Sequence, residues 1–314
     1  MRIIFMGSPQ FAVPSLVALH AAYEVAAVIT APDKPAGRGK QMQETAVKHS
    51  AEALGIPVMQ PSNLKDENFL NDLAVLKADL FVVVAFRMLP GVVFEMPPMG
   101  CINLHASLLP DYRGAAPINW AIINGESKSG LTTFFIEKEI DTGLILLQAE
   151  LSISDAEAAG SLHDRMMEAG ADLLVKTARG LDSGQLQGRP QMIEFDKTYP
   201  KAPKLFRETG LIDWQNPALS IHNLIRGLNP FPGSYSAVAG LSTGDNLKIW
   251  TGKVLEMGGN LDPGKVEIRE GNRLIVGTGE GKLELLEVQA PGKKRVSAAD
   301  FLRGIHIKGE FFFQ

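Results

Sequence analysis

The stretch "DLFVVVA", residues 79–85, decides the fold class of this chain. It is a continuous apolar run of strand length, which is typical of a parallel strand buried on both faces of its sheet. The runs "RIIFM" (2–6) and "EVAAVIT" (24–30) are of the same kind, and segments with helical spacing separate them. Strands that alternate with helices indicate a doubly wound α/β domain with a mostly parallel sheet. We expect this domain to occupy residues 1–190.

The other elements of this domain continue the alternation. Helices are expected over residues 11–19, 44–55, 65–77, 115–124 and 158–180. Further strands are expected at "IPVMQ" (56–60), "GCINLH" (100–105), "LTTFFIE" (131–137) and "LILLQAEL" (144–151). The stretch "APDKPAGRGK" (31–40) is rich in proline, glycine and basic residues, so it is expected to be a loop.

The pattern changes in the C-terminal third of the chain. After a predicted linker over residues 191–206 and a helix at 217–228, several short strands are separated by turn residues: "LKIWTGKVLE", "GKVEIRE", "RLIVGTG" and "GKLELLEVQ". Short strands with this spacing predict a small antiparallel β-barrel, which we expect to be OB-like. The predicted C-terminal β-barrel domain covers residues 207–314.

The composition, with 45% hydrophobic and 21% charged residues, is that of an ordinary globular protein. No apolar run approaches the roughly 18 residues that a transmembrane helix needs, so no membrane partner is expected. The N-terminus "MRIIFMGSPQF" lacks the features of a signal peptide, and the single cysteine, Cys101, fits a reducing cytoplasm. The six histidines are scattered without metal-ligand spacing, so no metal is expected.

The charge is unevenly distributed along the chain. Residues 1–200 hold 16 Lys and Arg against 23 Asp and Glu, whereas residues 201–314 hold 15 against 12. The net charge is therefore −7 in the first part and +3 in the second, within a total of −4. This asymmetry is compatible with chance, and equally with a catalytic domain followed by a module that meets a polyanion.

Two polar side chains interrupt the apolar strand at residues 100–105. Asn103 and His105 are two residues apart, so in a strand they share one face, while Ile102 and Leu104 take the other. Polar groups on such a face must find partners or water. They either tie down the turn that follows or form the edge of an active site, because ligands bind outside the carboxyl ends of strands in this class of fold.

The residues that follow favour the active-site interpretation. Pro110, Arg113 and Gly114 belong to a loop after the strand, and Arg113 places a cation there. Farther along, "EIDTG" (139–143) places the carboxylate of Asp141 in a tight turn between two strand-like runs. An aspartate in a turn is common for purely structural reasons, so Asp141 alone does not decide between the two interpretations.

Taken together, these motifs resemble the folate-dependent formyltransferase superfamily, whose members use 10-formyltetrahydrofolate. The resemblance begins with "NLHASLLPDYRGAAP" (103–117) followed by "DTG" (141–143). Further motifs, in order along the chain, are similar to the members that formylate methionyl initiator tRNA: "FMGSPQFA" (5–12), "PDKPAGRGK" (32–40), "LNPFPGSY" (228–235) and "APGKKRVSAADFL" (290–302). The segment "AFRMLP" (85–90) departs from the family pattern, so the lining of the folate pocket is expected to differ there.

The resemblance implies a catalytic set of Asn103, His105 and Asp141. It implies transfer of the formyl group from 10-formyltetrahydrofolate to the α-amino group of methionyl initiator tRNA, by direct attack of the amine and with no metal. Asn103 would donate to the developing oxyanion. His105 would have one of three roles: to donate to the same oxygen, to move the proton shed by the amine, or to protonate the leaving nitrogen. Asp141 would orient the imidazole ring of His105 and stabilise its charged form.

The resemblance also implies two sets of binding residues. The folate pocket would be lined by residues of the loop after the strand: Ser107, Leu108, Leu109, Pro110, Arg113 and Gly114. The tRNA would meet basic side chains in two places: Lys34, Arg38 and Lys40 in the first, and Lys293, Lys294 and Arg295 in the second. From the residues alone, each basic stretch could equally be a solvated surface segment with no contact to tRNA. The sequence around Ser107 is more consistent with a residue that holds the turn than with a nucleophile.

Three other functions remain compatible with these residues. The acceptor could be an amino-sugar nucleotide, since enzymes that formylate such sugars carry a similar run after the strand. Water could replace the amine, which would make the protein a folate deformylase. The protein could also bind folate or RNA without catalysis. The basic residues at 32–40 and 293–295 favour tRNA, and we expect a monomer.

Overall fold

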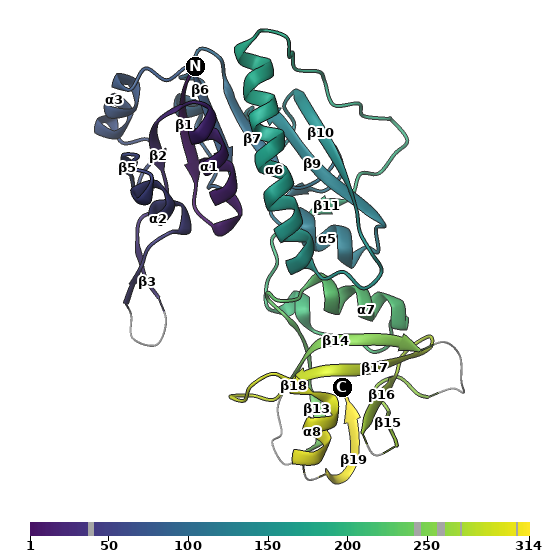
Figure 1. The fold of residues 1–314 in the computed structure, drawn as a ribbon. Coiled ribbons are helices and arrows are strands. Elements are labelled where there is room, and N and C mark those ends of the chain that lie inside the picture. The colour runs from purple at the N-terminus through teal and green to yellow at the C-terminus, as the bar shows by residue number, and fades with distance from the viewer. Residues whose placement is uncertain (37–40, 242–245, 256–260, 271, 306) are drawn as a thin grey trace. The chain divides into compact units, whose positions relative to one another are not determined.

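The structure is a computed structural model that describes residues 1–36, 41–241, 246–255, 261–270, 272–305 and 307–314. The chain forms two compact units (Figure 1). The first unit contains the segments Met1–Gly114, Ser129–Ser152 and His163–Lys201. The second contains Ala115–Lys128, Ile153–Leu162 and Ala202–Gln314. Within the described ranges, no helix is long and apolar enough to cross a membrane.

A seven-stranded sheet forms the centre of the first unit, in the order β10-β9-β7-β6-β1-β2-β5. Its strands are β1 (Arg2–Gly7), β2 (Glu24–Ile29), β5 (Val58–Met59), β6 (Leu80–Val84), β7 (Cys101–His105), β9 (Lys128–Phe135) and β10 (Ile145–Ser152). The pairs from β5 to β7 are parallel, whereas β9 runs antiparallel to β7. The mostly parallel α/β sheet predicted from the sequence is therefore confirmed. All five residues of β6 are buried, as its apolar sequence predicted.

Helices cover both faces of this sheet (Figure 1). They are the 3-10 helix η1 (Gln10–Ala12) and the α-helices α1 (Val13–Ala22), α2 (Ala46–Ala53), α3 (Glu67–Val75), α4 (Gly91–Phe94) and α6 (Ala159–Asp182). Side chains of α3 and α4 pack on one face in a cluster that includes Cys101 of β7. On the other face α6 approaches closely, because a Cβ on Gly170 would lie 2.6 Å from Leu104 Cδ2.

The strand β7 thus alternates between two buried environments. Cys101 faces the cluster of α3 and α4, and Leu104 faces α6. By the two-residue period of a strand, Asn103 and His105 lie on the same face as Cys101. The parallel neighbour β6 ends beside them, with Val84 paired to Leu104. The two polar side chains therefore stand at the carboxyl edge of the sheet, which is the edge where ligands bind in doubly wound folds.

The segment predicted as a loop at residues 31–40 contains regular structure. The strands β3 (Lys34–Ala36) and β4 (Gln41–Gln43) pair antiparallel, with Lys34 opposite Gln43. Proline and glycine content suggested only irregular chain, but Lys34–Ala36 and Gln41–Gln43 form two short strands that pair with each other. Residues 37–40, which include Arg38 and Lys40, lie outside the described residues.

The second unit is rich in antiparallel strands. One sheet has the order β12-β14-β17-β16-β15, with β18 paired to β17, and β13 pairs with β19 in another. Its strands are β12 (Ser234–Ser236), β13 (Val238–Leu241), β14 (Leu247–Leu255), β15 (Val266–Arg269), β16 (Arg273–Gly277), β17 (Lys282–Gln289), β18 (Val296–Ser297) and β19 (Ile307–Phe313). An OB-like closure of these strands stays a prediction.

Four helical segments belong to the second unit. They are α5 (Pro117–Ile123), η2 (Glu208–Gly210), α7 (Ala218–Gly227) and α8 (Ala298–Gly304). Ile221 and Ile225 of α7 and Phe301 of α8 pack into the apolar core that the strands form. The helix α5 is tied to α7, because Asn119 donates to the carbonyl of Gly227 at 2.7 Å. The two-residue strands β8 (Arg113–Gly114) and β11 (Lys201–Ala202) pair with each other.

Candidate active site

Asn103 and His105 differ in burial and in whether their side chains form hydrogen bonds within the protein. His105 is only 6% exposed, and its backbone pairs with Thr132 of β9. Asn103 is half-buried between Val83 of β6 and Phe134 of β9. Its amide makes none of the side-chain hydrogen bonds found among the described residues. A strand side chain whose amide is unoccupied is free to donate to a ligand at this edge of the sheet.

The contacts of the His105 ring fix its orientation. Nε2 lies 2.9 Å from the carbonyl oxygen of Tyr112. Because a carbonyl only accepts, Nε2 carries hydrogen and donates it, which leaves Nδ1 as the nitrogen that can exchange a proton. Nδ1 lies 3.8 Å from Asp141 Oδ2, and the edge-to-face ring of Phe134 is 6.5 Å away between centroids. The imidazole is therefore held at one nitrogen and available at the other.

Asp141 faces this available nitrogen from a strained turn. Its φ is +55°, a left-handed conformation that few residues other than glycine adopt. Its Oδ2 accepts a hydrogen bond from the backbone N–H of Gly114 at 2.9 Å. Two residues later the chain passes so close to β9 that a Cβ on Gly143 would lie 1.8 Å from the carbonyl oxygen of Phe135. The glycine of "DTG" is thus required for the approach that brings Asp141 to His105.

The loop after β7 is braced by a hydrogen bond within it and by two hydrogen bonds to Thr132 of β9. Ser107 is fully buried, and its Oγ donates to the carbonyl of Asp111 at 2.6 Å. Thr132 Oγ1 donates to the carbonyl of Ser107 at 2.7 Å and accepts from the N–H of Leu109 at 3.1 Å. The side chain of Leu109 is buried with Phe134 in a small apolar cluster. Because both side chains are buried, Ser107 and Leu109 stabilise the conformation of the loop.

The other residues predicted to line the folate pocket are more accessible. Leu108, Pro110, Arg113 and Gly114 are all half-buried. A Cβ on Gly130 would lie 2.5 Å from Leu108 Cδ2, so β9 leaves room for that side chain only because residue 130 is glycine. Gly114 is itself the partner of Asp141, and Tyr112, the partner of His105, lies between Pro110 and Arg113 in the chain.

Arg113 braces the site through a residue that sequence reasoning missed. Arg113 Nε donates to Gln191 Oε1 at 3.2 Å, and a second guanidinium N–H shares the same oxygen. The amide of Gln191 donates in turn to the carbonyl oxygens of Asp141 at 2.8 Å and Gly143 at 3.0 Å. Gln191 thus connects the cation of one loop to the turn that holds Asp141. Its position in the predicted linker gave no sign of this role.

The predicted tRNA-contacting residues are found in both units. Lys34 lies in β3 of the first unit and is exposed. Lys293, Lys294 and Arg295 are exposed in the second unit, where Arg295 pairs with Glu287. The guanidinium of Arg295 lies 5.3 Å from the ring centroid of Trp250. Trp250 itself is only 9% exposed, so the accessible part of this surface consists of the three cations.

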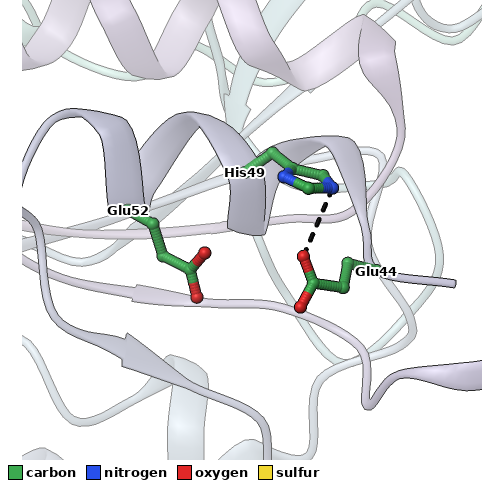
Figure 2. Close-up of side chains that lie close together, drawn as sticks. All are labelled: Glu44, His49 and Glu52. Atoms are coloured by element: carbon green, nitrogen blue, oxygen red, sulfur yellow. Dashed lines mark ion pairs between the residues drawn. The ribbon is translucent and has the colours of Figure 1, made fainter. Parts of the chain in front are cut away.

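One group of potential metal ligands occurs among the described residues. Glu44, His49 and Glu52 each place one ligand atom within 4.8 Å of the others (Figure 2). His49 and Glu52 are exposed, and Glu44 Oε2 already pairs with His49 Nε2 at 3.3 Å. Glu44 also accepts from Lys48, so its charge is neutralised without an ion. These ion pairs account for the cluster, so we do not assign a metal to it.

The segment that departs from the family pattern has its own contacts. Arg87 donates to the carbonyl oxygens of Pro61 and Ser62, and its guanidinium lies 5.6 Å from the ring centroid of Phe86. Burial lowers the pKa of Arg87. Ala85 has a φ of +48°, which turns the chain sharply after β6. Phe86 packs against the cluster of α3 and α4, whereas Met88 in the same segment is 73% exposed.

Comparisons with known proteins identify the family. The model of the formyl transferase family matches residues 1–178, and that of the formyl transferase C-terminal domain matches residues 204–306. The chain belongs to the formyl transferase family. The resemblance inferred from the sequence motifs is thereby confirmed.

Curated relatives in this family match nearly the whole chain. The methionyl-tRNA formyltransferase of Flavobacterium johnsoniae is 47% identical over 311 residues, which cover 99% of this chain and 98% of the relative. That of Bacteroides fragilis is 44% identical over 316 residues, which cover 99% and 97%.

Solved structures share the fold at lower identity. The N-formyltransferase from Helicobacter canadensis, in complex with folinic acid and dTDP-3-aminofucose, has a TM-score of 0.63 at 20% identity and covers 90% of this chain and 98% of its own. HypX from Aquifex aeolicus in complex with tetrahydrofolic acid has a TM-score of 0.63 at 18% identity and covers 99% of this chain and 50% of its own.

Proposed function

We propose that this formyl transferase moves the formyl group of 10-formyltetrahydrofolate to the α-amino group of methionyl initiator tRNA. The observation that carries the proposal is the contact of His105 with Tyr112 and Asp141 beside the unoccupied amide of Asn103, in a chain similar over its full length to methionyl-tRNA formyltransferases. Identity of 42–47% to relatives of that name favours tRNA over an amino-sugar acceptor.

The first chemical task is addition of the amine to the formyl carbon. A free α-amino group has a pKa of about 8, and an adjacent ester lowers it, so much of the nucleophile is neutral near neutral pH. The larger barrier is the negative charge that develops on the formyl oxygen. Asn103 supplies a neutral donor at a fixed place on the strand β7, and loss of one such donor typically costs about 10²–10³-fold in rate.

The second task is proton transfer. As the new N–C bond forms, the amine must lose a proton, and as the bond from the formyl carbon to N10 breaks, N10 must gain one. His105 Nδ1 is the nitrogen that can accept and return this proton, because Nε2 is held by the carbonyl of Tyr112. The carboxylate of Asp141, 3.8 Å away, stabilises the ring while it carries the charge.

Binding of the two substrates is assigned to different elements. Residues 107–114 follow the catalytic strand and would contact the folate, with Leu108, Pro110, Arg113 and Gly114 as accessible members. The exposed cations Lys34, Lys293, Lys294 and Arg295 would contact tRNA phosphates, together with Arg38 and Lys40. We assign catalysis to residues 1–190, a linker to 191–206 and tRNA binding to 207–314, in a cytoplasmic monomer.

One assay with three acceptor conditions tests the proposal. 10-formyltetrahydrofolate is supplied with methionyl initiator tRNA, with an amino-sugar nucleotide, and with no acceptor, and formylated product and formate are measured. The proposal predicts formylation of the methionyl tRNA alone. Product only with the sugar would identify a sugar formyltransferase, and formate without an acceptor would identify a deformylase.

A further inference from the structure

A glutamine of β10, at one edge of the seven-stranded sheet, contacts the loop that follows β7. The side chain of Gln148 is half-buried. Its Nε2 donates to the carbonyl oxygen of Leu109 at 3.0 Å and to Thr132 Oγ1 at 3.1 Å. The two N–H groups of this amide are therefore used by the loop itself and by a side chain that holds the loop.

Leu109 is held through both of its backbone polar groups. Its N–H donates to Thr132 Oγ1 at 3.1 Å, and its carbonyl accepts from Gln148. The hydroxyl of Thr132 also donates to the carbonyl of Ser107 at 2.7 Å. A hydroxyl has one donor and two acceptor sites, so all three sites of Thr132 are used. The backbone from Ser107 to Leu109 is thus bound to the two strands β9 and β10.

A further contact fixes which way the Gln148 amide points. Gln148 Oε1 accepts from the guanidinium of Arg189 at 3.4 Å. Arg189 is itself attached to β10, because it exchanges two backbone hydrogen bonds with Ile145, at 2.8 and 2.9 Å. Since an arginine side chain only donates, it must face the amide oxygen, which leaves Nε2 to face Leu109 and Thr132.

The loop that Gln148 binds is also the loop that holds the imidazole of His105. Thr132 is the residue of β9 that pairs with His105 of β7. Directly opposed residues of an antiparallel pair place their side chains on the same face of the sheet, so the hydroxyl and the imidazole share a face. Farther along the loop, the carbonyl of Tyr112 accepts from His105 Nε2. A change in the loop at Leu109 would therefore occur beside the candidate catalytic residues.

Apolar packing alone does not set the direction of the loop backbone. The Leu109 side chain packs with Phe134 and Ile145. Such contacts are non-directional, whereas a hydrogen bond has a preferred direction. The apolar cluster therefore holds the Leu109 side chain, and the hydrogen bonds from Gln148 and to Thr132 orient its backbone. That orientation decides how the half-buried neighbours Leu108 and Pro110 are presented.

We propose that Gln148 is a positioning residue for the folate: it orients the backbone of Leu109, so that Leu108 and Pro110 meet the co-substrate in a fixed geometry. This inference rests on the proposed function, because it takes residues 107–114 as the folate-binding loop. A loop that is ordered before binding reduces the entropy that binding must otherwise supply. Binding of 10-formyltetrahydrofolate should therefore depend on Gln148, whereas binding of the tRNA should not.

The test compares substitutions in the full-length protein. Gln148→Met keeps the length of the side chain and removes both donors, and Gln148→Glu removes the donors but keeps the acceptor for Arg189. Gln185→Met makes the first change at an exposed glutamine of the same unit. The readouts are the Kd for 10-formyltetrahydrofolate without an acceptor, kcat, KM for each substrate, and Tm.

A second control separates positioning from stability. Thr177 is a fully buried residue of α6, and its hydroxyl lies 2.8 Å from that of Thr133 in β9. Thr133 is paired with Leu104, so its side chain lies on the face opposite to that of Thr132. Thr177→Val therefore removes a buried hydrogen bond from the same strand without touching the loop.

Gln148→Met should raise the folate Kd by about tenfold and lower kcat by a similar factor, because a small misplacement of a substrate-binding element is costly. KM for the tRNA should not change. Gln148→Glu should lose at least as much, since a carboxylate would face the carbonyl of Leu109. Thr177→Val should lower Tm with an unchanged folate Kd, and Gln185→Met should match the wild type in every readout.

Two results would overturn the inference. A wild-type folate Kd for Gln148→Met would show that the loop needs no donor from β10. An equal rise of the folate Kd in Thr177→Val would show that the effect follows stability and not the contact with Leu109. A wild-type protein that binds the folate but does not formylate methionyl tRNA would instead contradict the proposed function, so the two failures are distinguishable.

Discussion

Replacement of Gln191 by alanine should slow formyl transfer although this residue is outside the catalytic set. Gln191 holds the Asp141 turn through two donated hydrogen bonds, to the carbonyl oxygens of Asp141 and Gly143, and it accepts from Arg113. Asp141 occupies a left-handed conformation at φ +55° that other contacts must maintain. Without Gln191, the turn should relax away from His105.

The size of the effect follows from these contacts. Each hydrogen bond contributes about 0.5–1.5 kcal/mol net, so loss of the two donated bonds and the accepted one should cost roughly 1.5–4.5 kcal/mol of stability at most, less where water replaces them. The effect on rate should be larger than this local loss suggests. A shift of about 1 Å in a positioned carboxylate can cost roughly 10²-fold, so we expect kcat to fall by about 10–10²-fold.

The assay is steady-state formylation of methionyl initiator tRNA, with kcat, KM for each substrate and Tm measured on the same preparations. Gln191→Glu keeps the acceptor for Arg113 and removes both donors, so it should be at least as slow as Gln191→Ala. Gln185→Ala removes an exposed amide from the same segment and should match the wild type. A Gln191→Ala protein with lowered Tm and unchanged kcat would refute the reasoning, because the residue would then serve stability alone.

Three further predictions follow from local geometry and charge. Gly143→Ala should lower Tm and abolish most activity, since its Cβ would meet the carbonyl of Phe135 at 1.8 Å; a fully active, stable variant would contradict this. The hydrogen bond from Arg273 lowers the pKa of Glu284 below 4.5, so this ion pair should stabilise the fold above that pH and lose its contribution as the pH falls. Glu284→Gln should therefore flatten the decline of Tm in acid. An unchanged decline would show that the ion pair does not contribute to stability. Catalytic efficiency should fall steeply as the salt concentration rises. Lys294→Ala should reduce the slope of log(kcat/KM) against log[salt] by about 1. An unchanged slope would show that Lys294 does not contact a phosphate.

The elements that carry the site could be predicted because their signals are local. The apolar run at 79–85 corresponds to the fully buried strand β6 at Leu80–Val84. The two-residue period of a strand predicts that Asn103 and His105 share one face. The helix expected at 44–55 is α2 at Ala46–Ala53, and Gly55 after it has the positive φ of +70° that a helix end favours.

The remaining parts of the site depend on contacts between distant residues. Gln191 lies 78 residues from Arg113 along the chain, and no periodicity connects them. The same holds for the carbonyl of Tyr112, which binds His105 through the backbone and therefore leaves no trace in residue type. By contrast, α8 could have been found, because Ser297 caps it by accepting from the backbone N–H of Asp300, three residues later.

The central claim is that Asn103 stabilises the charge that develops on the formyl oxygen. The most direct measurement is the single-turnover rate of formyl transfer to methionyl initiator tRNA by Asn103→Ala, with both substrates bound beforehand and their Kd values measured separately. The account predicts a rate lower by about 10²–10³-fold, with Kd values close to those of the wild type. A rate near that of the wild type would contradict it.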